Sequence, residues 1–209
     1  MLLTAGRSGR TAIYAKNVTG GFSSRRKEAS KMLVLIKTNN SDMTLTAEKP
    51  ALIKLSPNFT LAEMANNAGD AAKPQYIISA ESDAFISTLQ AFRNIVNQRV
   101  IINSGYRQFE YNKKIGGDPN SRHLYGCAAD IRPLELANFT EARYINTWFE
   151  ALAQTKQHGA INIYADRSYY HLETNTGARL LTVRVYKDID LYNKLYLQYN
   201  SPFIAVQKF

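Results

Sequence analysis

Apolar residues recur at helical spacing in two stretches of the chain. Between Ser82 and Asn97 the stripe consists of Phe85, Ile86, Leu89, Phe92, Ile95 and Val96, and between Thr140 and Gln154 it consists of Ala142, Ile145, Trp148, Phe149 and Leu152. Each set falls on one side of a helix, so the spacing predicts two amphipathic helices that bury these sides in a core. The aromatic residues of the stripes are therefore expected to be core residues and not a cofactor site.

Shorter apolar runs predict strands before, between and after the two helices. These runs are 51–55, 99–103, 128–131, 161–164, 169–173 and 180–186. Turn residues separate the last three runs, so an antiparallel meander is the simplest topology for them. Two short helices are also expected, one where Thr60 and Glu63 have capping-box spacing and one from Glu110 to Ile115. The pattern thus predicts helices packed with a small antiparallel sheet.

The composition narrows the class of protein. With 209 residues, of which 45% are hydrophobic, the chain is long enough for one globular domain. The single cysteine, Cys127, excludes a disulfide within the chain and a zinc site built from several thiolates. No apolar run approaches the roughly 18 residues of a membrane span. The run from Met32 to Ile36 is too short for the apolar part of a secretory signal.

Positive charge is concentrated at the start of the chain. The formal net charge is +9, and residues 1–37 carry +7 of it, in a segment that also contains glycine and serine. We expect residues 1–49 to be a basic, disordered leader that ends in a polar linker at 38–50. An equally simple interpretation is that Met32 is the true first residue of the protein. Residues 50–187 are then the folded domain and 188–209 a C-terminal extension. Specific binding of nucleic acid is not expected, because the charges do not lie on a folded face. Salt-sensitive attraction of the leader to polyanions stays open.

Two histidines and one aspartate form the candidate chemistry. His123 and Asp130 are seven positions apart, and His171 belongs to a later predicted strand. Gly126 is expected to bend the chain, so that a histidine on a loop and an aspartate on a strand converge. Two histidines and one carboxylate leave an open position for water on a tetrahedral zinc ion. These residues therefore indicate a zinc hydrolase.

Three motifs together resemble a known family. They are Ser104-Gly-Tyr-Arg107, then Ser-x-His-x-x-Gly-x-Ala-x-Asp from Ser121 to Asp130, and Tyr170-His171-Leu-Glu173. This order resembles the zinc D-Ala-D-Ala peptidases of the M15 family, in particular the short subfamily A enzymes of bacteria and their phages, over about residues 56–186. The resemblance implies an α+β, hedgehog/DD-peptidase-like fold, with a small antiparallel sheet and flanking helices around a zinc cleft. It also implies Zn²⁺ as cofactor, with His123, Asp130 and His171 as ligands.

Further roles follow from the resemblance. Arg107 is expected to hold the carboxylate of the substrate or the developing oxyanion. Ser121 is expected either to hydrogen-bond the substrate or to organise the loop. Relatives carry Glu or Asp three residues before the last zinc histidine, where this chain has Ser168, which does not accept a proton near neutral pH. The general base is therefore assigned to Asp166, with Glu173 as the second candidate.

The resemblance predicts hydrolysis of peptidoglycan stem peptides at a D-amino-acid bond, by a carboxypeptidase or an endopeptidase. The lack of an export signal fits a phage lysis or entry protein, such as an endolysin. The alternative is a catalytically weak zinc-binding module that binds the cell wall, for example as a phage virion component, because of Ser168 and the aromatic C-terminal tail. The oligomeric state is left open.

Overall fold

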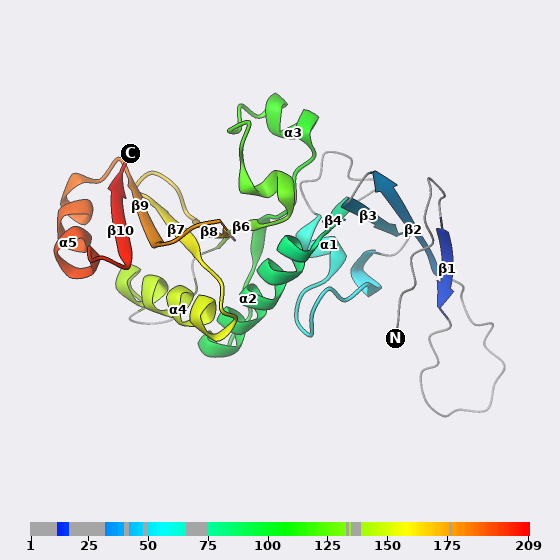
Figure 1. Ribbon diagram of the computed structural model, residues 1–209, viewed down its shortest axis with the longest axis horizontal. Coiled ribbons are helices and arrows are strands. Elements are labelled where there is room, and N and C mark those ends of the chain that lie inside the picture. Colours follow the sequence, from blue (N-terminus) through cyan, green and yellow to red (C-terminus); the bar gives the residue numbers. More distant parts are fainter. Residues whose placement is uncertain are drawn as a thin grey trace.

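The computed structural model describes residues 12–16, 32–39, 42–47, 50–65, 75–132, 134, 139–175 and 177–209. Its helices and strands are arranged around two sheets (Figure 1). In chain order the elements are β1 (Ala12–Lys16), β2 (Met32–Asn39), β3 (Asp42–Ala47), η1 (Pro50–Leu52), α1 (Leu61–Met64), β4 (Gln75–Ile78), α2 (Ala80–Val96), β5 (Ile102–Ser104), α3 (Phe109–Lys114), η2 (Arg122–Tyr125), β6 (Ala128–Ile131), α4 (Glu141–Gln154), β7 (Gly159–Tyr164), β8 (Tyr170–Thr174), β9 (Leu181–Tyr186), α5 (Ile189–Tyr199) and β10 (Ile204–Lys208).

The first sheet has four antiparallel strands in the order β1-β2-β3-β4. Strand β3 lies within the stretch 38–50 that we expected to be a linker, because Met43, Leu45 and Ala47 alternate with polar residues in a strand pattern. The run 51–55 was predicted as a strand, and this prediction is wrong. Its first two residues belong to η1, and Lys54 forms only a single bridge to Thr60. As for the predicted disorder of the leader, residues 1–11, 17–31, 40–41 and 48–49 lie outside the described residues.

The second sheet has six strands in the order β10-β9-β7-β8-β6-β5 and is mixed. Helices and sheet occur together as expected, but the prediction of a small antiparallel sheet with a meander is wrong. Strand β9 pairs in parallel with β7 and is not adjacent to β8 in the sheet. The reason is that β6 already occupies the outer edge of β8, so the chain crosses to the free edge of β7. Strand β10 then pairs in parallel with β9 after the crossover helix α5.

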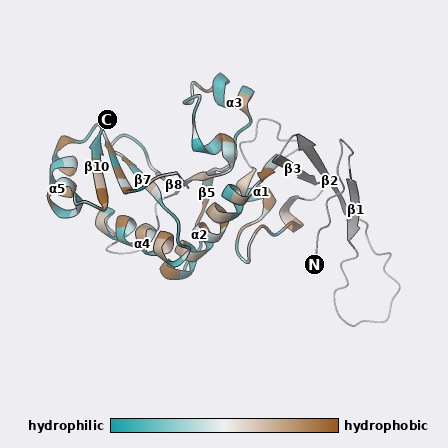
Figure 2. Cartoon of the chain, viewed as in Figure 1, coloured by the Kyte–Doolittle hydropathy of each residue, from teal (hydrophilic) through white to brown (hydrophobic). Residues whose placement is uncertain are grey.

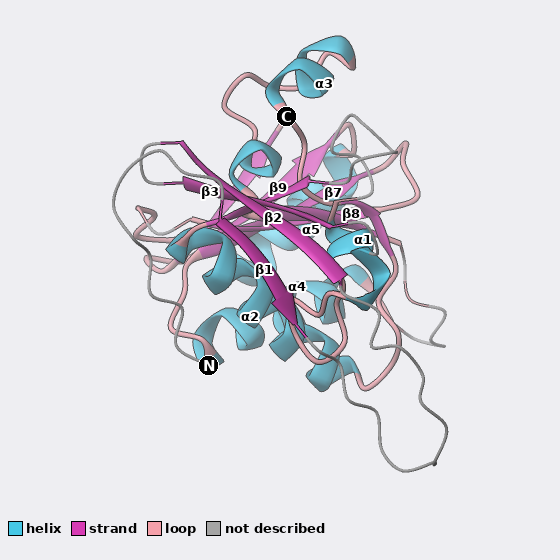
Figure 3. Ribbon diagram, turned by 90° about the vertical axis from the view of Figure 1, so that its right-hand side faces the viewer, coloured by secondary structure: helices cyan, strands magenta, loops and turns pink. Residues whose placement is uncertain are grey.

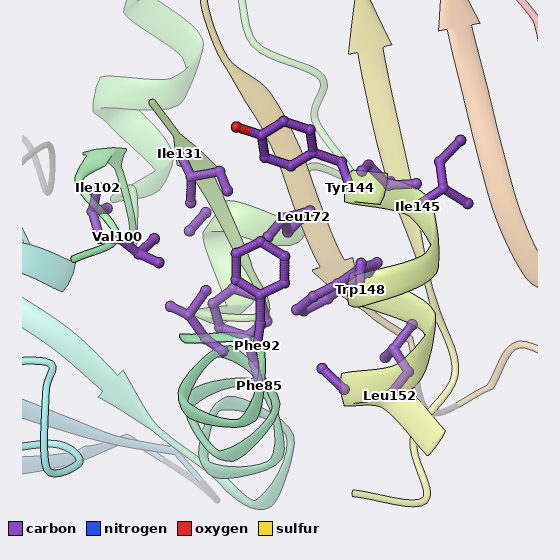
Figure 4. Close-up of a cluster of buried hydrophobic side chains, with 14 of the residues drawn as sticks. Phe85, Phe92, Val100, Ile102, Ile131, Tyr144, Ile145, Trp148, Leu152 and Leu172 are labelled. Carbon is purple, nitrogen blue, oxygen red and sulfur yellow. The ribbon is translucent and has the colours of Figure 1, made fainter. Parts of the chain in front are cut away.

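Helices α2 and α4 cover one face of the six-stranded sheet, and α3 lies on the other side of it (Figures 1 and 3). Both long helices match the predicted stripes closely. In the core, Trp148 of α4 packs edge-on against Phe92 of α2 and belongs to the same buried cluster as Leu172 of β8 (Figure 4). Figure 2 shows the hydropathy of the two sides of the sheet. The helices and strands carry both brown and teal residues, whereas the region around α3 is mostly teal. One face of the sheet is thus left for polar residues.

Residues 188–209, expected as an extension, pack against this domain. Leu195 and Tyr199 of α5 and Val206 of β10 are buried in the same core as the long helices. The hydroxyl group of Tyr199 donates a hydrogen bond to the carbonyl group of Ala142 in α4 at 3.1 Å. Among the described residues, no helix is both long and apolar enough to cross a membrane.

Candidate metal centre

A row of polar side chains crosses the face of the sheet that is turned away from the helices. Strand register brings the members side by side in the order Ser104, Asp130, His171, Asn162 and Arg184. All five line one cleft. Their neighbours along the strands, such as Ile131 and Leu172, point into the core. The alternation of side chains along a strand therefore places the candidate chemistry on one face and the hydrophobic core on the other.

His123 reaches this row from a loop. It lies in η2, which is capped by Gly126, and Gly126 has a φ of 66°. This left-handed conformation is accessible to glycine at little cost and confirms the predicted bend. The Nδ1–H group of His123 donates a hydrogen bond to the carbonyl oxygen of Gly105 at 2.7 Å. The lone pair of its Nε2 atom therefore faces the other two residues.

The three candidate ligands meet at short distances. The Nε2 atom of His123 lies 3.2 Å from Nδ1 of His171 and 3.3 Å from Oδ1 of Asp130, and the last two atoms are 2.9 Å apart. All three residues are buried, and this donor set is able to hold a metal ion. Tetrahedral zinc with bonds of about 2.0–2.1 Å separates its ligand atoms by about 3.3 Å. The spacing and the chemistry of the donor set thus fit Zn²⁺.

Two of the three candidate ligands, His123 and Asp130, already favour the protonation state that a metal ion requires. Burial lowers the pKa of His123, which favours the neutral imidazole that metals require. Burial alone would raise the pKa of Asp130, but its close contacts with the rings of His123 and His171 outweigh burial and hold that pKa well below its usual value. Burial lowers the pKa of His171, yet the adjacent carboxylates of Asp130 and Glu173 outweigh burial and raise it to about 9. Proton release from His171 therefore accompanies metal binding at neutral pH.

Arg107 lies directly beside the centre. Its Nη2 atom donates to Oδ2 of Asp130 at 2.7 Å, and its Nε atom donates to Oγ of Ser104 at 2.9 Å. These two bonds use two of the five N–H groups of the guanidinium group. Arg107 also lines the cleft. It is thus positioned both to orient Asp130 and to face a bound molecule.

Glu173 is buried two residues after His171 on the same strand face. Its Oε2 atom accepts a hydrogen bond from Nε2–H of His171 at 3.1 Å, and its Oε1 atom accepts one from Nη1 of Arg184 at 3.0 Å. Burial by itself would raise the pKa of Glu173, but His171 and Arg184 lower it to about 2. Glu173 is therefore ionised at neutral pH.

Asp166 and Ser121 line the same cleft without a direct contact to the three candidate ligands among the described interactions. Asp166 lies in the exposed turn after β7, where it accepts a hydrogen bond from Nζ of Lys187 at 2.6 Å. That bond lowers the pKa of Asp166. Ser121 precedes η2, and its carbonyl group accepts from the backbone N–H of Leu124 at 3.0 Å. The two residues thus line the cleft from different loops, one after β7 and one before η2.

The cleft has a volume of about 880 Å³, near the upper end of the range of about 300–1,000 Å³ for ligand pockets. One wall carries stacked rings, with Tyr186 4.6 Å from Tyr164 and 4.9 Å from Phe209 between ring centroids. The other wall includes Tyr111 and Ile115, from α3 and the loop after it. The cleft thus offers both polar side chains and aromatic rings to a bound molecule.

Sequence reasoning missed Asn162, Arg184 and the carbonyl group of Gly105. A signal for the first two was present, because each is a polar residue within an otherwise apolar strand, at a position that alternates with core residues. The carbonyl group of Gly105 had no such signal, since every residue carries one. Its role depends on the path of the loop alone.

Comparison with known proteins gives two matches. The family model for Peptidase M15 matches residues 57–173, which is more than half of the chain and includes every site residue predicted from the sequence. The zinc D-Ala-D-Ala carboxypeptidase of Streptomyces albus G is 36% identical over 78 residues, which cover 35% of this chain and 31% of that protein. The match thus spans about a third of the length of this relative.

Proposed function

Because the chain belongs to the M15 peptidase family, we propose that it is a zinc metallopeptidase that hydrolyses peptidoglycan stem peptides at a D-amino-acid bond. The motif-based resemblance to this family is confirmed. The observation that carries the proposal is the convergence of His123, Asp130 and His171 within 4.8 Å on the floor of the cleft. The substrate class is supported by the name of the Streptomyces relative, a D-Ala-D-Ala carboxypeptidase.

The family and the buried His-Asp-His group support Zn²⁺ as the cofactor. We assign His123 Nε2, Asp130 Oδ1 and His171 Nδ1 as its ligands, because these three atoms face one another. When bound, Zn²⁺ supplies Lewis-acid polarisation of a carbonyl group and lowers the pKa of a water molecule to about 7. Three ligands from the protein leave one coordination position open for the water molecule or the carbonyl group, as in other catalytic zinc sites.

Arg107 and Ser121 are proposed to bind the substrate. The guanidinium group of Arg107 has N–H groups beyond those used by Asp130 and Ser104, and it carries the positive charge that stabilises a carboxylate or a developing oxyanion. Ser121 also lines the cleft and offers a hydroxyl group to the peptide, or it serves only to shape the loop before His123. Arg107 orients the scissile bond over the cleft floor in this proposal, and Ser121 helps if its hydroxyl group contacts the peptide.

Asp166 is proposed to accept the proton of the attacking water and to pass it to the leaving amine. Its carboxylate lines the cleft and is ionised at neutral pH, since Lys187 lowers its pKa. The ion pair with Lys187 joins two exposed side chains, and such pairs contribute little energy. The carboxylate of Asp166 is thus able to leave Lys187 and accept the proton of the attacking water.

The direct test is hydrolysis of purified muropeptides by the zinc-loaded protein, followed by mass spectrometry. We expect products that are lost in His123→Ala and kept in His158→Ala, a matched change at an exposed histidine outside the cleft. Stem peptides that end in free D-Ala and cross-linked dimers should be tested side by side to separate carboxypeptidase from endopeptidase. Equal hydrolysis by wild type and His123→Ala would contradict the proposal.

A catalytically weak, zinc-binding cell-wall module, for example in a phage virion, is the second candidate. It is favoured by Ser168 at the usual position of the base and by the exposed position of Asp166. This candidate requires tight zinc and muropeptide binding without products. Turnover by the wild type that falls about 10²- to 10⁴-fold in Asp166→Asn would exclude it.

A further inference from the structure

The two histidines of the centre present different nitrogen atoms to it. His123 presents Nε2, since its Nδ1–H is held by the carbonyl oxygen of Gly105. His171 presents Nδ1, which lies 2.9 Å from Oδ1 of Asp130. A neutral imidazole has one N–H and one lone pair, so the group that accepts the N–H decides which atom is left as a ligand. For His171 that group is Glu173.

We propose that Glu173 is a positioning residue that selects Nδ1 of His171 as the metal ligand, and that Arg184 holds Glu173 in place. This inference rests on the proposed zinc site but not on the proposed reaction. It assigns to Glu173 a task other than that of the general base. The two nitrogen atoms lie on different sides of the imidazole ring, so Glu173 is separated from the centre by the ring that it orients.

The surroundings of Glu173 support this assignment. Both carboxylate oxygens are engaged, one by His171 at 3.1 Å and the other by Arg184 at 3.0 Å. The side chain is buried, with 6% of the residue exposed. A buried carboxylate held at both oxygens is fixed in orientation, as outer hydrogen-bond partners of metal ligands are. Asp166, by contrast, is exposed and is paired only at the rim of the cleft.

Strand geometry explains why Glu173 can reach Nε2. His171 and Glu173 are two residues apart on β8 and therefore point to the same side of the sheet. Arg184 of β9 extends along the same face over Asn162 of β7, whose Oδ1 atom accepts from the guanidinium group at 3.2 Å. The line from Asn162 through Arg184 and Glu173 to His171 is a continuous set of hydrogen bonds. It ends at the metal ligand.

The test is the zinc affinity of each variant, measured by competition with a chromogenic chelator. Glu173→Leu removes the acceptor and should weaken zinc binding about 10- to 100-fold, the range typical of such partners. Glu173→Gln keeps one oxygen acceptor and should lose less. Arg184→Gln, a change at a half-buried side chain, should produce a smaller loss in the same direction. Asp166→Asn is the matched control and should bind zinc like the wild type.

Activity at saturating zinc separates positioning from catalysis. Glu173→Gln should then recover most of the wild-type kcat, whereas Asp166→Asn should not. A Glu173→Gln protein that binds zinc normally but stays inactive would overturn the inference and make Glu173 the base. If the wild type binds no zinc, the proposed zinc site itself fails, which is a different outcome.

One measurement does not depend on how the variants fold. In the zinc-loaded wild type, long-range ¹H–¹⁵N spectra report which nitrogen of each histidine carries the proton. We expect the proton on Nε2 of His171 and on Nδ1 of His123. A proton on Nδ1 of His171 would overturn the inference.

Discussion

Every candidate ligand of the centre is hydrogen-bonded to a group that is not itself a candidate ligand. Arg107 donates to Asp130, and the carbonyl oxygen of Gly105 accepts from His123. Outer partners of this kind orient ligands and raise metal affinity. The backbone around Gly105 is therefore as much a part of the site as the side chains of the motifs.

Gly105→Ala is expected to damage the fold and the site together. A Cβ atom at this position would lie 2.1 Å from the carbonyl oxygen of Met64, so one of the two backbone segments has to move. We expect a loss of about 1–3 kcal/mol in the free energy of unfolding, typical of overpacking, together with weaker zinc binding.

The control is Gly177→Ala, where the nearest atom to an added Cβ lies at 3.6 Å, an ordinary contact distance. Chemical denaturation of both variants measures the difference. Equal stability of the two proteins would show that the loop at Gly105 adjusts without cost and that its backbone does not constrain His123.

Motif spacing singled out the three candidate ligands, and the structure brings them together. It did not decide between Asp166 and Glu173 as the base, because both lie within five residues of His171 in the sequence. Their difference arises from burial and from partners on other strands, Lys187 for Asp166 and Arg184 for Glu173. Such pairs join residues that are distant in sequence and that no local pattern connects.

At the level of elements, helices α2 and α4 were predicted within two residues of their observed limits, because the apolar stripe depends only on local spacing. Strand pairing was predicted less well. The parallel pairing of β7 and β9 depends on β6 having occupied the edge of β8. Competition between strands for edges is a property of the whole sheet and is not encoded in any single run.

Trp148 connects these elements, so its removal tests the packing of helices on the sheet. It is fully buried between α4 and α2 and contacts the rings of Phe85 and Phe92. Trp148→Ala is expected to lower the free energy of unfolding by about 3–5 kcal/mol. Thermal or chemical unfolding measures this loss.

Leu197→Ala is the matched control on helix α5, because Leu197 is 87% exposed. Its effect is expected to stay within about 0.5 kcal/mol, as for most surface substitutions. A Trp148→Ala protein as stable as Leu197→Ala would show that the helices are not held on the sheet through this residue.

At the scale of the molecule, the segment 188–209 completes the core that supports the site. Its buried residues Leu195, Tyr199 and Val206 pack with the residues of the long helices, and β10 covers the edge of β9. This segment was expected only as an extension, and in the structure it forms helix α5 and strand β10. Its contribution to the core depends on the order of the strands in the sheet, and the amino-acid composition of the tail does not predict that order.

Deletion of residues 188–209 is therefore expected to abolish cooperative unfolding and to cause aggregation, because it exposes apolar core residues and an open strand edge. Phe203→Ser, at a side chain that is 77% exposed, is the control and should keep the fold. Far-UV circular dichroism and light scattering on heating distinguish the two outcomes. A truncated protein that still unfolds cooperatively would show that the domain ends before α5.

The central claim is that one zinc ion is held by His123, Asp130 and His171 and keeps a position open to solvent. Anomalous diffraction at the zinc edge from crystals of the zinc-loaded protein tests it most directly. The account predicts one strong peak about 2.0–2.2 Å from Nε2 of His123, Oδ1 of Asp130 and Nδ1 of His171, with no fourth ligand from the protein. A peak elsewhere, or zinc bound by four protein side chains, would contradict it.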